Sequence, residues 1–334
     1  AGTTLGIAVG NNVDTNYGNN ISGAGNIVLN ATQGDTYFNY TADRGAVRIF
    51  GDNAGFTGSW TVKDGNRLRV DSLTALGAGT GLTIEDGGQI LTNISNFNSA
   101  VPITVQDKGW SETAGQLGAI RLFGNGVLSG AVTLTGDTRI TAFGGAGTLS
   151  GKISGNAGLE YGFNHTGTGS GTISGLNGAN DYTGNTSITR MTINGENITN
   201  GGAASSLGAG AIVAMDASTF NVTGAGAMTT NRTFTLGAMG IGASSIGVTN
   251  PANTLTFTGV INNVVPQVGS SAPFRQGLNF QQFSTAGTGG TVVLDTAAPI
   301  ITSGTTVHRQ NLTLAGNTNF TVGASGFGTA GTFN

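Results

Sequence analysis

The chain has 334 residues, of which 60 are glycine, 37% are hydrophobic, only 9% are charged and none is cysteine, and its net charge is −3. This composition excludes disulfides, thiolate metal sites and cysteine nucleophiles. With no basic stripe and no apolar run of about 18 residues, the sequence predicts neither nucleic-acid binding nor a membrane-spanning helix.

Short segments that alternate apolar and polar residues recur along the chain, and each predicts a β-strand. In chain order they include 46–50, 67–70, 81–84, 131–135, 254–258, 291–294 and 311–314. Glycine, asparagine and aspartate flank them and supply the positive φ that tight corners require. No helix-length window has a period of 3.6 residues, and the Ala/Gly/Ser stretch 201–210 is predicted to be a loop.

The chain also repeats itself. Residues 45–52 read GAVRIFGD and residues 118–125 read GAIRLFGN. A looser repeat joins an aromatic residue to a later Leu-Gly-Ala-Gly phrase, from Phe56 to Leu76 and from Tyr182 to Leu207. Repeats of this length are typical of a solenoid, in which each repeat forms one coil that buries its apolar side only when stacked on its neighbours.

We therefore predict an all-β fold in which residues 1–334 form a single β-solenoid. The alternative is an antiparallel β-sandwich or propeller, for which Asp64-Gly65, Asp86-Gly87 and Asn194-Gly195 are hairpin signals. The unequal lengths of the repeats favour the solenoid, because a solenoid loop absorbs extra residues without disturbing the stacking.

The phrase NDYTGNT at residues 180–186, followed by LGAG at 207–210, resembles the autotransporter-associated β-strand repeat, also called the passenger-associated transport repeat. Residues 54–60 with 76–79 fit the same pattern with two departures: Ala54 stands where the family has asparagine, and Trp60 where it has threonine. The resemblance extends over 45–265, while the ends, 1–44 and 266–334, are more diverged.

This resemblance implies a right-handed parallel β-helix within the secreted passenger of a bacterial surface protein. It implies an extracellular or cell-surface location and a structural or adhesive role. It implies contact with a host-surface or matrix carbohydrate or protein, and no catalytic, cofactor-binding or metal-ligating residues. Such passengers often precede an outer-membrane barrel, and no segment here has its alternating strands of about 10 residues.

Two other functions stay open at this stage. Subunits that self-associate end to end through open coil edges would build an extracellular filament, with the polar tails 1–25 and 317–334 as caps or donated strands. A polysaccharide-acting enzyme would instead use two carboxylates about 5 Å apart.

Carboxylates concentrate in the N-terminal half of the chain. They are Asp35, Asp43, Asp52, Asp64, Asp71, Glu85, Asp86, Asp107, Glu112 and Asp137. Arginines occupy the same region, namely Arg44, Arg48, Arg67, Arg69, Arg121 and Arg139. Because opposite charges alternate here, we interpret these residues as ion pairs between coils.

The remaining candidate residues carry less specific signals. His165 and His308 have no partner at metal-ligand spacing, and no G-x-S-x-G elbow frames a nucleophile. No cofactor is expected, and Ca²⁺ would have only Glu85-Asp86 or the segment 14–16 as ligands. Three aromatic residues belong either to the core or to a sugar-stacking surface; these are Trp60, Trp110 and Tyr161.

Overall fold

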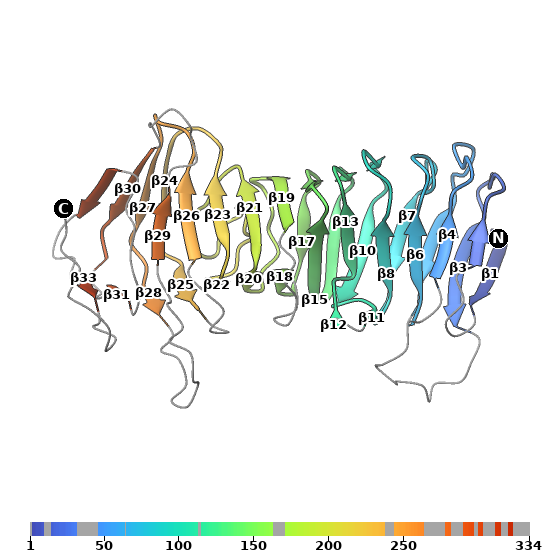
Figure 1. Cartoon of the computed structure of the whole chain (residues 1–334), viewed down its shortest axis with the longest axis horizontal. Helices are drawn as coiled ribbons and strands as arrows, with labels where there is room; N and C mark the ends of the chain where they lie inside the picture. The colour runs from blue at the N-terminus through green and yellow to red at the C-terminus, as the bar shows by residue number, and fades with distance from the viewer. Residues whose placement is uncertain are drawn as a thin grey trace. The chain divides into compact units, whose positions relative to one another are not determined.

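The computed structural model describes residues 2–9, 15–31, 46–63, 65–112, 115–162, 171–237, 244–263, 278–281, 290–296, 300–302, 311–314 and 320–322. These residues form 33 strands and no helix (Figure 1). The chain divides into two compact units, Ala1–Gly175 (unit 1) and Leu176–Asn334 (unit 2).

Unit 1 is a stack of coils whose strands form parallel ladders. In order of pairing, the first ladder contains β1 (Thr4–Val9), β3 (Asn26–Ala31), β5 (Ser59–Val62), β7 (Gly81–Ile84), β10 (Ile103–Asp107), the start of β15 (Val132–Phe143) and β17 (Ile153–Gly155). Each strand lies beside the equivalent strand of the next coil, so Leu82 pairs with Ile103, 21 residues later.

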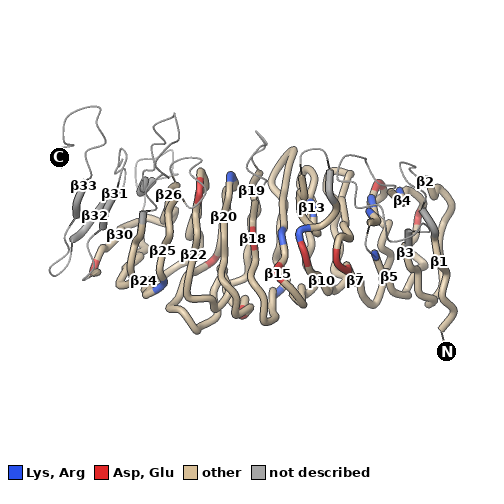
Figure 2. Tube along the Cα trace, turned by 90° about the horizontal axis from the view of Figure 1, so that it is seen from below, with Lys and Arg blue, Asp and Glu red and all other residues tan. Residues whose placement is uncertain are grey.

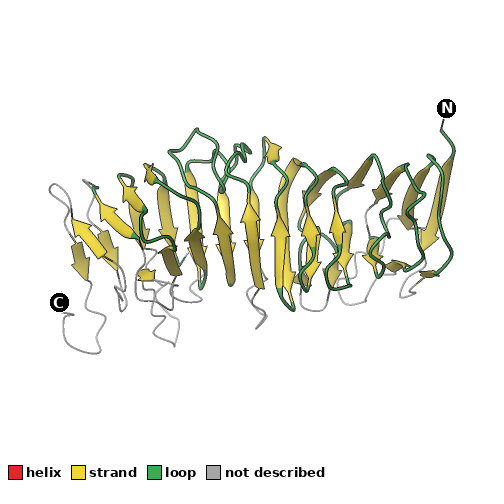
Figure 3. Ribbon diagram, turned by 90° about the horizontal axis from the view of Figure 1, so that it is seen from above, coloured by secondary structure: helices red, strands yellow, loops and turns green. Residues whose placement is uncertain are grey.

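A second ladder forms another side of the same coils. It contains β2 (Thr15–Tyr17), β4 (Ala46–Ile49), β6 (Arg67–Val70), β8 (Gln89–Thr92), β13 (Ile120–Phe123), the end of β15 and β18 (Leu159–Gly162). A third, shorter ladder contains β9 (Asn98–Ser99), β14 (Val127–Leu128), β16 (Ala146–Leu149) and β19 (Gly171–Leu176). Figure 3 shows the strands of neighbouring coils side by side.

The alternation of the strands places one side of each ladder in the core. In β6, Leu68 and Val70 are fully buried, while Arg67 and Arg69 point outward and are partly exposed. Each buried aliphatic side chain of this kind contributes about 1.5–3 kcal/mol relative to an exposed one. Stacked coils therefore bury continuous rows of apolar residues that one coil could not bury alone.

Unit 2 repeats the three-ladder plan. Its first ladder contains β20 (Thr186–Thr189), β22 (Ile212–Asp216), β25 (Thr233–Leu236) and β28 (Ile261–Asn263). The second contains β21 (Met191–Gly195), β23 (Thr219–Val222), β26 (Ser244–Val248) and β29 (Leu278–Gln281). The third contains β24 (Ala227–Thr230), β27 (Thr254–Phe257), β30 (Thr291–Leu294) and β32 (Asn311–Leu314). In addition, β31 (Ile300–Thr302) pairs with β33 (Phe320–Val322).

The predicted β-solenoid is confirmed, and the antiparallel sandwich or propeller is wrong. The ladders of both units consist of parallel pairs; one short antiparallel pair, β11 (Ser111–Glu112) with β12 (Gly115–Gln116), is inserted in unit 1. Asp86-Gly87 forms a corner between β7 and β8, which belong to different ladders, and Asn194-Gly195 lies inside β21. Asp64 lies outside the described residues. The right-handed turn and the single solenoid over 1–334 stay predictions.

The residues of NDYTGNT, 180–186, form hydrogen bonds to the corner of the next coil in unit 2, and we call this set of hydrogen bonds the clasp. The side-chain amide of Asn180 donates to the carbonyl of Ser206 at 3.2 Å. The Thr186 hydroxyl donates to the carbonyl of Leu207 at 3.0 Å, so the Tyr182 hydroxyl donates to Thr186 at 2.8 Å. The motif residues therefore satisfy buried carbonyls at the corner where the next coil turns.

The same clasp occurs in unit 1 with different residues. Asn53 donates to the carbonyl of Ala75 at 2.8 Å, and the indole N–H of Trp60 donates to the carbonyl of Leu76 at 3.3 Å. The asparagine of the motif is therefore Asn53 and not position 54, because this copy has one more residue before its aromatic side chain. Trp60 fulfils the role of the threonine with a different donor.

One arginine of unit 2 is part of the interior. Arg232 is fully buried, and its guanidinium donates to oxygens of the loop 199–210. The partners are the carbonyls of Thr199, Asn200, Ala203, Leu207, Gly208 and Gly210 and the hydroxyl of Ser205. Burial lowers the pKa of Arg232. None of these partners is a carboxylate, so this charge is held by the dipoles of loop carbonyls, several of which also accept from hydroxyl groups of Thr186, Thr199, Ser205 or Thr230.

Candidate interaction surface

The outer sides of the two long ladders of unit 1 differ in chemistry. On the first ladder, consecutive coils place hydroxyl side chains in one row; this row, the hydroxyl face, is Thr61, Thr83, Thr104, Thr133 and Ser154. On the second ladder the outward residues include five arginines; this surface, the arginine face, carries Arg48, Arg67, Arg69, Arg121 and Arg139. Figure 2 shows how few charges the rest of the tube carries.

Coil stacking assembles the arginine face from residues that are far apart in the sequence. Arg48 of β4 pairs with Arg69 of β6, Arg69 with Leu91 of β8, and Leu91 with Arg121 of β13. The face holds five of the chain's 13 lysines and arginines. The sequence contains no basic run, so this surface was not predicted; the signal that could have found it is the 21-residue offset between Arg48 and Arg69.

An acidic residue lies between two of these arginines. Asp71 accepts from Nε of Arg48 at 3.1 Å, from Nη2 of Arg69 at 3.2 Å and from the amide of Asn93 at 2.7 Å. Its carboxylate also lies 2.9 Å from Nε of Arg69. Burial by itself would raise the pKa of Asp71, but the hydrogen bonds from Asn93, Arg48 and Arg69 outweigh it and lower the pKa. The Arg48 and Arg69 side chains are 32% and 26% exposed and Asp71 only 13%, so the basic groups lie nearer the solvent.

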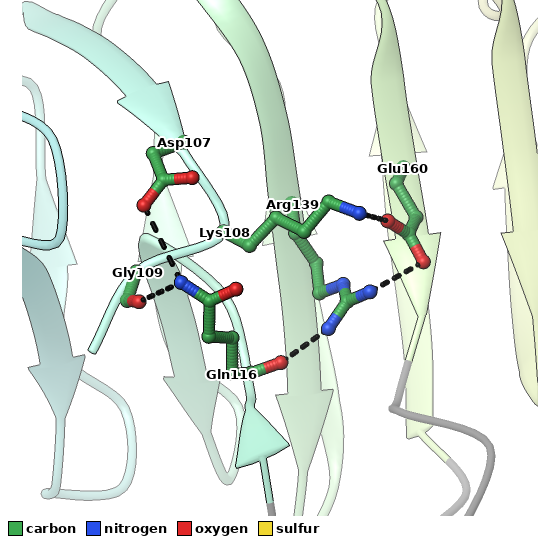
Figure 4. Close-up of polar contacts among 6 residues, drawn as sticks. All are labelled: Asp107, Lys108, Gly109, Gln116, Arg139 and Glu160. Carbon is green, nitrogen blue, oxygen red and sulfur yellow. Dashed lines mark hydrogen bonds and ion pairs between the residues drawn. The ribbon is translucent and has the colours of Figure 1, made fainter. Parts of the chain in front are cut away.

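A second acidic residue holds the other end of the face. Glu160 lies 2.9 Å from Nη2 of Arg139 and 3.7 Å from Nζ of Lys108, as Figure 4 shows. Lys108 is 48% exposed and Glu160 only 14%. Arg139 is buried and also donates to the carbonyl of Gln116. The Glu160 carboxylate thus pairs with two basic side chains, and of these Lys108 is the one that faces solvent.

The insertion 108–118, of which the structure describes 108–112 and 115–118, contains β11 and β12, and its described part packs on the arginine face. The side-chain amide of Gln116 donates to Asp107 at 3.4 Å and to the carbonyl of Gly109 at 2.9 Å (Figure 4). The Arg67 guanidinium stacks on the Trp110 ring at 3.8 Å. Insertions on solenoids often form the binding side. Here the insertion covers Arg67 and Arg139 and leaves Arg48, Arg69 and Arg121 beside it.

Phenylalanines line the strand ends of the arginine face. Phe50 is 48% exposed, and its ring lies against the backbone of Gly18. Phe123 and Phe143 pair with a centroid distance of 5.0 Å, and Arg121 lies over the Phe143 ring at 4.3 Å. A half-exposed ring supported on one side by backbone offers its other side to a ligand.

The aromatic residues singled out from the sequence belong to the core instead. Trp60 and Tyr161 are fully buried, and Trp110 is only 3% exposed. The interpretation as core residues is confirmed for these three, and the sugar-stacking interpretation is wrong for them. Strand alternation explains this outcome for Trp60, since it lies in the inward row of β5.

Two further carboxylates of unit 1 bind groups of neighbouring coils. Glu85 pairs with Lys63 at 3.8 Å, and Asp137 accepts from the backbone N–H of Gly158 at 2.7 Å. The backbone N–H of Ala54 and the Thr74 hydroxyl lower the pKa of Asp52. A glycosidase acid requires a raised pKa, so neither Asp52 nor Asp71 has that environment.

Several candidate residues lie outside the described residues. They are Asp14, Asp35, Asp43, Arg44, Asp64, His165 and His308, together with the side chain of Glu112. Within the described ranges, no three histidine, aspartate or glutamate side chains gather as a metal site. Those ranges also hold no helix of the length and hydropathy that crossing a membrane requires. The absence of catalytic, cofactor-binding and metal residues, Ca²⁺ ligands included, stays a prediction.

Comparison with known proteins gives one informative similarity. No protein-family model and no solved structure matches the chain. The chain is 30% identical over 227 residues, or 65% of its length, to the adhesin BmaC autotransporter of Brucella suis biovar 1 (strain 1330). The match spans 6% of that protein. The chain is thus similar to a small segment of an autotransporter adhesin, in line with the resemblance predicted from its repeats.

Proposed function

We propose that the chain is a non-catalytic, adhesive segment of an extracellular β-solenoid on a bacterial surface, built from passenger-associated repeats. The observation that carries this proposal is its similarity to a segment of an autotransporter adhesin over 65% of its length. The parallel coils support it, since stacked repeats create extended surfaces for binding while the interior supplies the stability.

The arginine face is the contact surface in this proposal. Arg48, Arg69 and Arg121 of this face project away from the apolar rows that hold the coils together. Arginine and aromatic side chains are also enriched where proteins bind partners. The hydroxyl face, on the same coils, has neither residue type and serves as an internal comparison.

Adhesion of coated beads to cultured host cells tests the proposal. Beads that carry the purified chain should attach to epithelial cells, and the soluble chain should compete. The variant Arg48→Gln/Arg69→Gln/Arg121→Gln should reduce attachment, while the matched variant Thr61→Gln/Thr83→Gln/Thr104→Gln on the hydroxyl face should leave it unchanged. Attachment no greater than that of albumin-coated beads, for several host cell types, would contradict the proposal.

The non-catalytic part of the proposal has its own test. Asp71 and Glu160 are held by basic partners at 2.9 Å, which suits ion pairing and leaves them poorly placed as proton donors. We expect no new reducing ends when the chain is incubated with acidic and neutral polysaccharides. Release of oligosaccharides that depends on any carboxylate of unit 1 would identify an enzyme instead. End-to-end self-association stays a prediction, and sedimentation analysis would test it.

A further inference from the structure

We infer that the arginine face binds an anionic polysaccharide, a linear chain with sulfate or carboxylate groups. This inference rests on the proposed function, because it names the ligand class of the same surface. Three features of the face support it. An outward pair of arginine and phenylalanine repeats, and the basic side chains are more exposed than their acidic partners. One half-exposed aromatic ring also rests on backbone.

The internal repeat of the sequence contains outward residues as well as core residues. Its two copies place Arg48 and Phe50 at the positions of Arg121 and Phe123, on β4 and β13 of the same ladder. The inward residues of these strands repeat because they fill equivalent positions in the core. The rings of Phe50 and Phe123 also pack between coils, on Gly18 and on Phe143. The repeated arginines lie three coil steps apart in one row, where a ligand with repeating groups can meet both.

The charge at the solvent boundary of the face is positive, although the whole chain carries −3. Arg48, Arg69 and Lys108 are each about twice as exposed as their acidic partners, or more, at 32%, 26% and 48% against 13% and 14%. Asp71 and Glu160 thus orient the bases and lie beneath them. This arrangement presents donors to an anion.

The side-chain types indicate which anion fits. The guanidinium is a planar fork that binds sulfate or carboxylate through two hydrogen bonds. The exposed ring of Phe50, with one side on Gly18, can stack on the apolar side of a sugar. Along the stacking direction, Arg48 and Arg69 lie one coil step apart and Arg121 lies two steps further, at about 4.8 Å per step, which suits a linear chain lying along the row.

Surface plasmon resonance with the full chain tests the inference. The immobilised probes are heparin, which has sulfate and carboxylate groups, hyaluronate, which has carboxylates alone, and neutral dextran. We expect binding to heparin or hyaluronate and none to dextran. Binding should weaken as NaCl rises from 50 to 500 mM, because added salt screens exposed charges.

Matched variants locate the site. Arg48→Gln/Arg121→Gln should weaken heparin binding at least about tenfold, since each removes charge-assisted hydrogen bonds. Arg48→Lys/Arg121→Lys keeps the charge without the fork and should have an intermediate effect. Lys152→Gln removes an exposed base elsewhere on unit 1 and should have none. Asp71 keeps Arg69 and Asn93 as partners in these variants, so folding should persist.

Three results would overturn the inference. They are equal binding to dextran, unchanged binding by the Arg48→Gln/Arg121→Gln variant, and stronger binding to phosphatidylserine vesicles or polyuridylate than to both anionic polysaccharides. Beads tested on cells stripped of anionic glycans separate this inference from the proposed function. If wild-type beads still attach there, the polysaccharide is wrong and the adhesive function stands. If they attach to no cell type, the adhesive function fails as well.

Discussion

The two long ladders of unit 1 belong to the same coils, yet their outer sides have opposite character. One presents the hydroxyl face, Thr61 to Ser154 in register, and the other presents the arginine face. Both bury aliphatic rows on their inner sides. Stacking therefore determines which residues face inward and leaves the outward rows free to differ. An outward row that departs from the Thr/Ser/Asn background of a charge-poor chain is therefore the place to look for function.

Arginine itself has two roles in the chain. Arg48 of unit 1 is partly exposed and shares Asp71 with Arg69. Arg232 of unit 2 is buried and binds loop oxygens without a carboxylate. The first role fits a contact surface, and the second fits a structural support for the coil.

The largest expected effect distinguishes these two roles. Arg232→Met should lower the free energy of unfolding by about 3–5 kcal/mol, because it removes the buried guanidinium and the hydrogen bonds that join it to the loop 199–210. Arg48→Met should lower it by less than about 1 kcal/mol, as for other exposed ion pairs. Urea denaturation followed by circular dichroism measures both. Equal losses for the two variants would contradict the division of roles.

The clasp in unit 1 should give the next largest effect. Asn53 donates to the carbonyl of Ala75 and accepts from the backbone N–H of Ile21, each at 2.8 Å. Asn53→Ala should cost about 2–3 kcal/mol in unfolding free energy, since it leaves both groups without their partner. Ala54→Ser, at the position that the sequence motif indicates, should change it by about 0.5 kcal/mol or less. If urea denaturation showed a larger loss for Ala54→Ser than for Asn53→Ala, position 54 and not Asn53 would be the asparagine position of the motif.

These contrasts also define what the sequence alone could predict. Strands such as β6 and β7 were predicted at their observed bounds, because alternation and flanking glycines mark them locally. The arginine face was not, because it depends on which residues meet across coils. That offset is 21 residues from Leu82 to Ile103 but 29 from Ile103 to Val132, where the insertion 108–118 lies. The positions of Trp60 and Asn53 depend on the same long-range register.

Lowering the pH should reduce the free energy of unfolding through Asp71, by less than either Arg232→Met or Asn53→Ala. The pKa of Asp71 is lowered in the folded chain from its ordinary 3.8, so the unfolded state takes up this proton at higher pH than the folded state. The stabilisation is complete above the ordinary value and is lost as pH falls through the lower, folded pKa. Asp71→Asn should reduce the difference in unfolding free energy between pH 6 and pH 3 by about 0.5–1 kcal/mol. An unchanged difference would show that Asp71 is not a stabilising partner.

The hydroxyl face should give the smallest effect. Thr83→Gln should change the free energy of unfolding by about 0.5 kcal/mol or less, because an outward side chain away from caps and core rarely matters more. The same variant should leave heparin binding unchanged. A loss of binding comparable to that of Arg48→Gln would mean that the two faces do not differ in function.

Distances measured across several coils show whether coil stacking builds both faces. Asn16 and Arg121 lie four coil steps apart on the second ladder, and Thr61 and Ser154 lie four steps apart on the first. At about 4.8 Å per step, each pair of backbone positions should be about 19 Å apart. Since the chain has no cysteine, spin labels on two double-cysteine variants can report both distances by pulsed electron resonance. Narrow distributions near this value are expected for both pairs. Distances beyond about 30 Å, or broad distributions, would contradict the parallel stacking from which the arginine face follows.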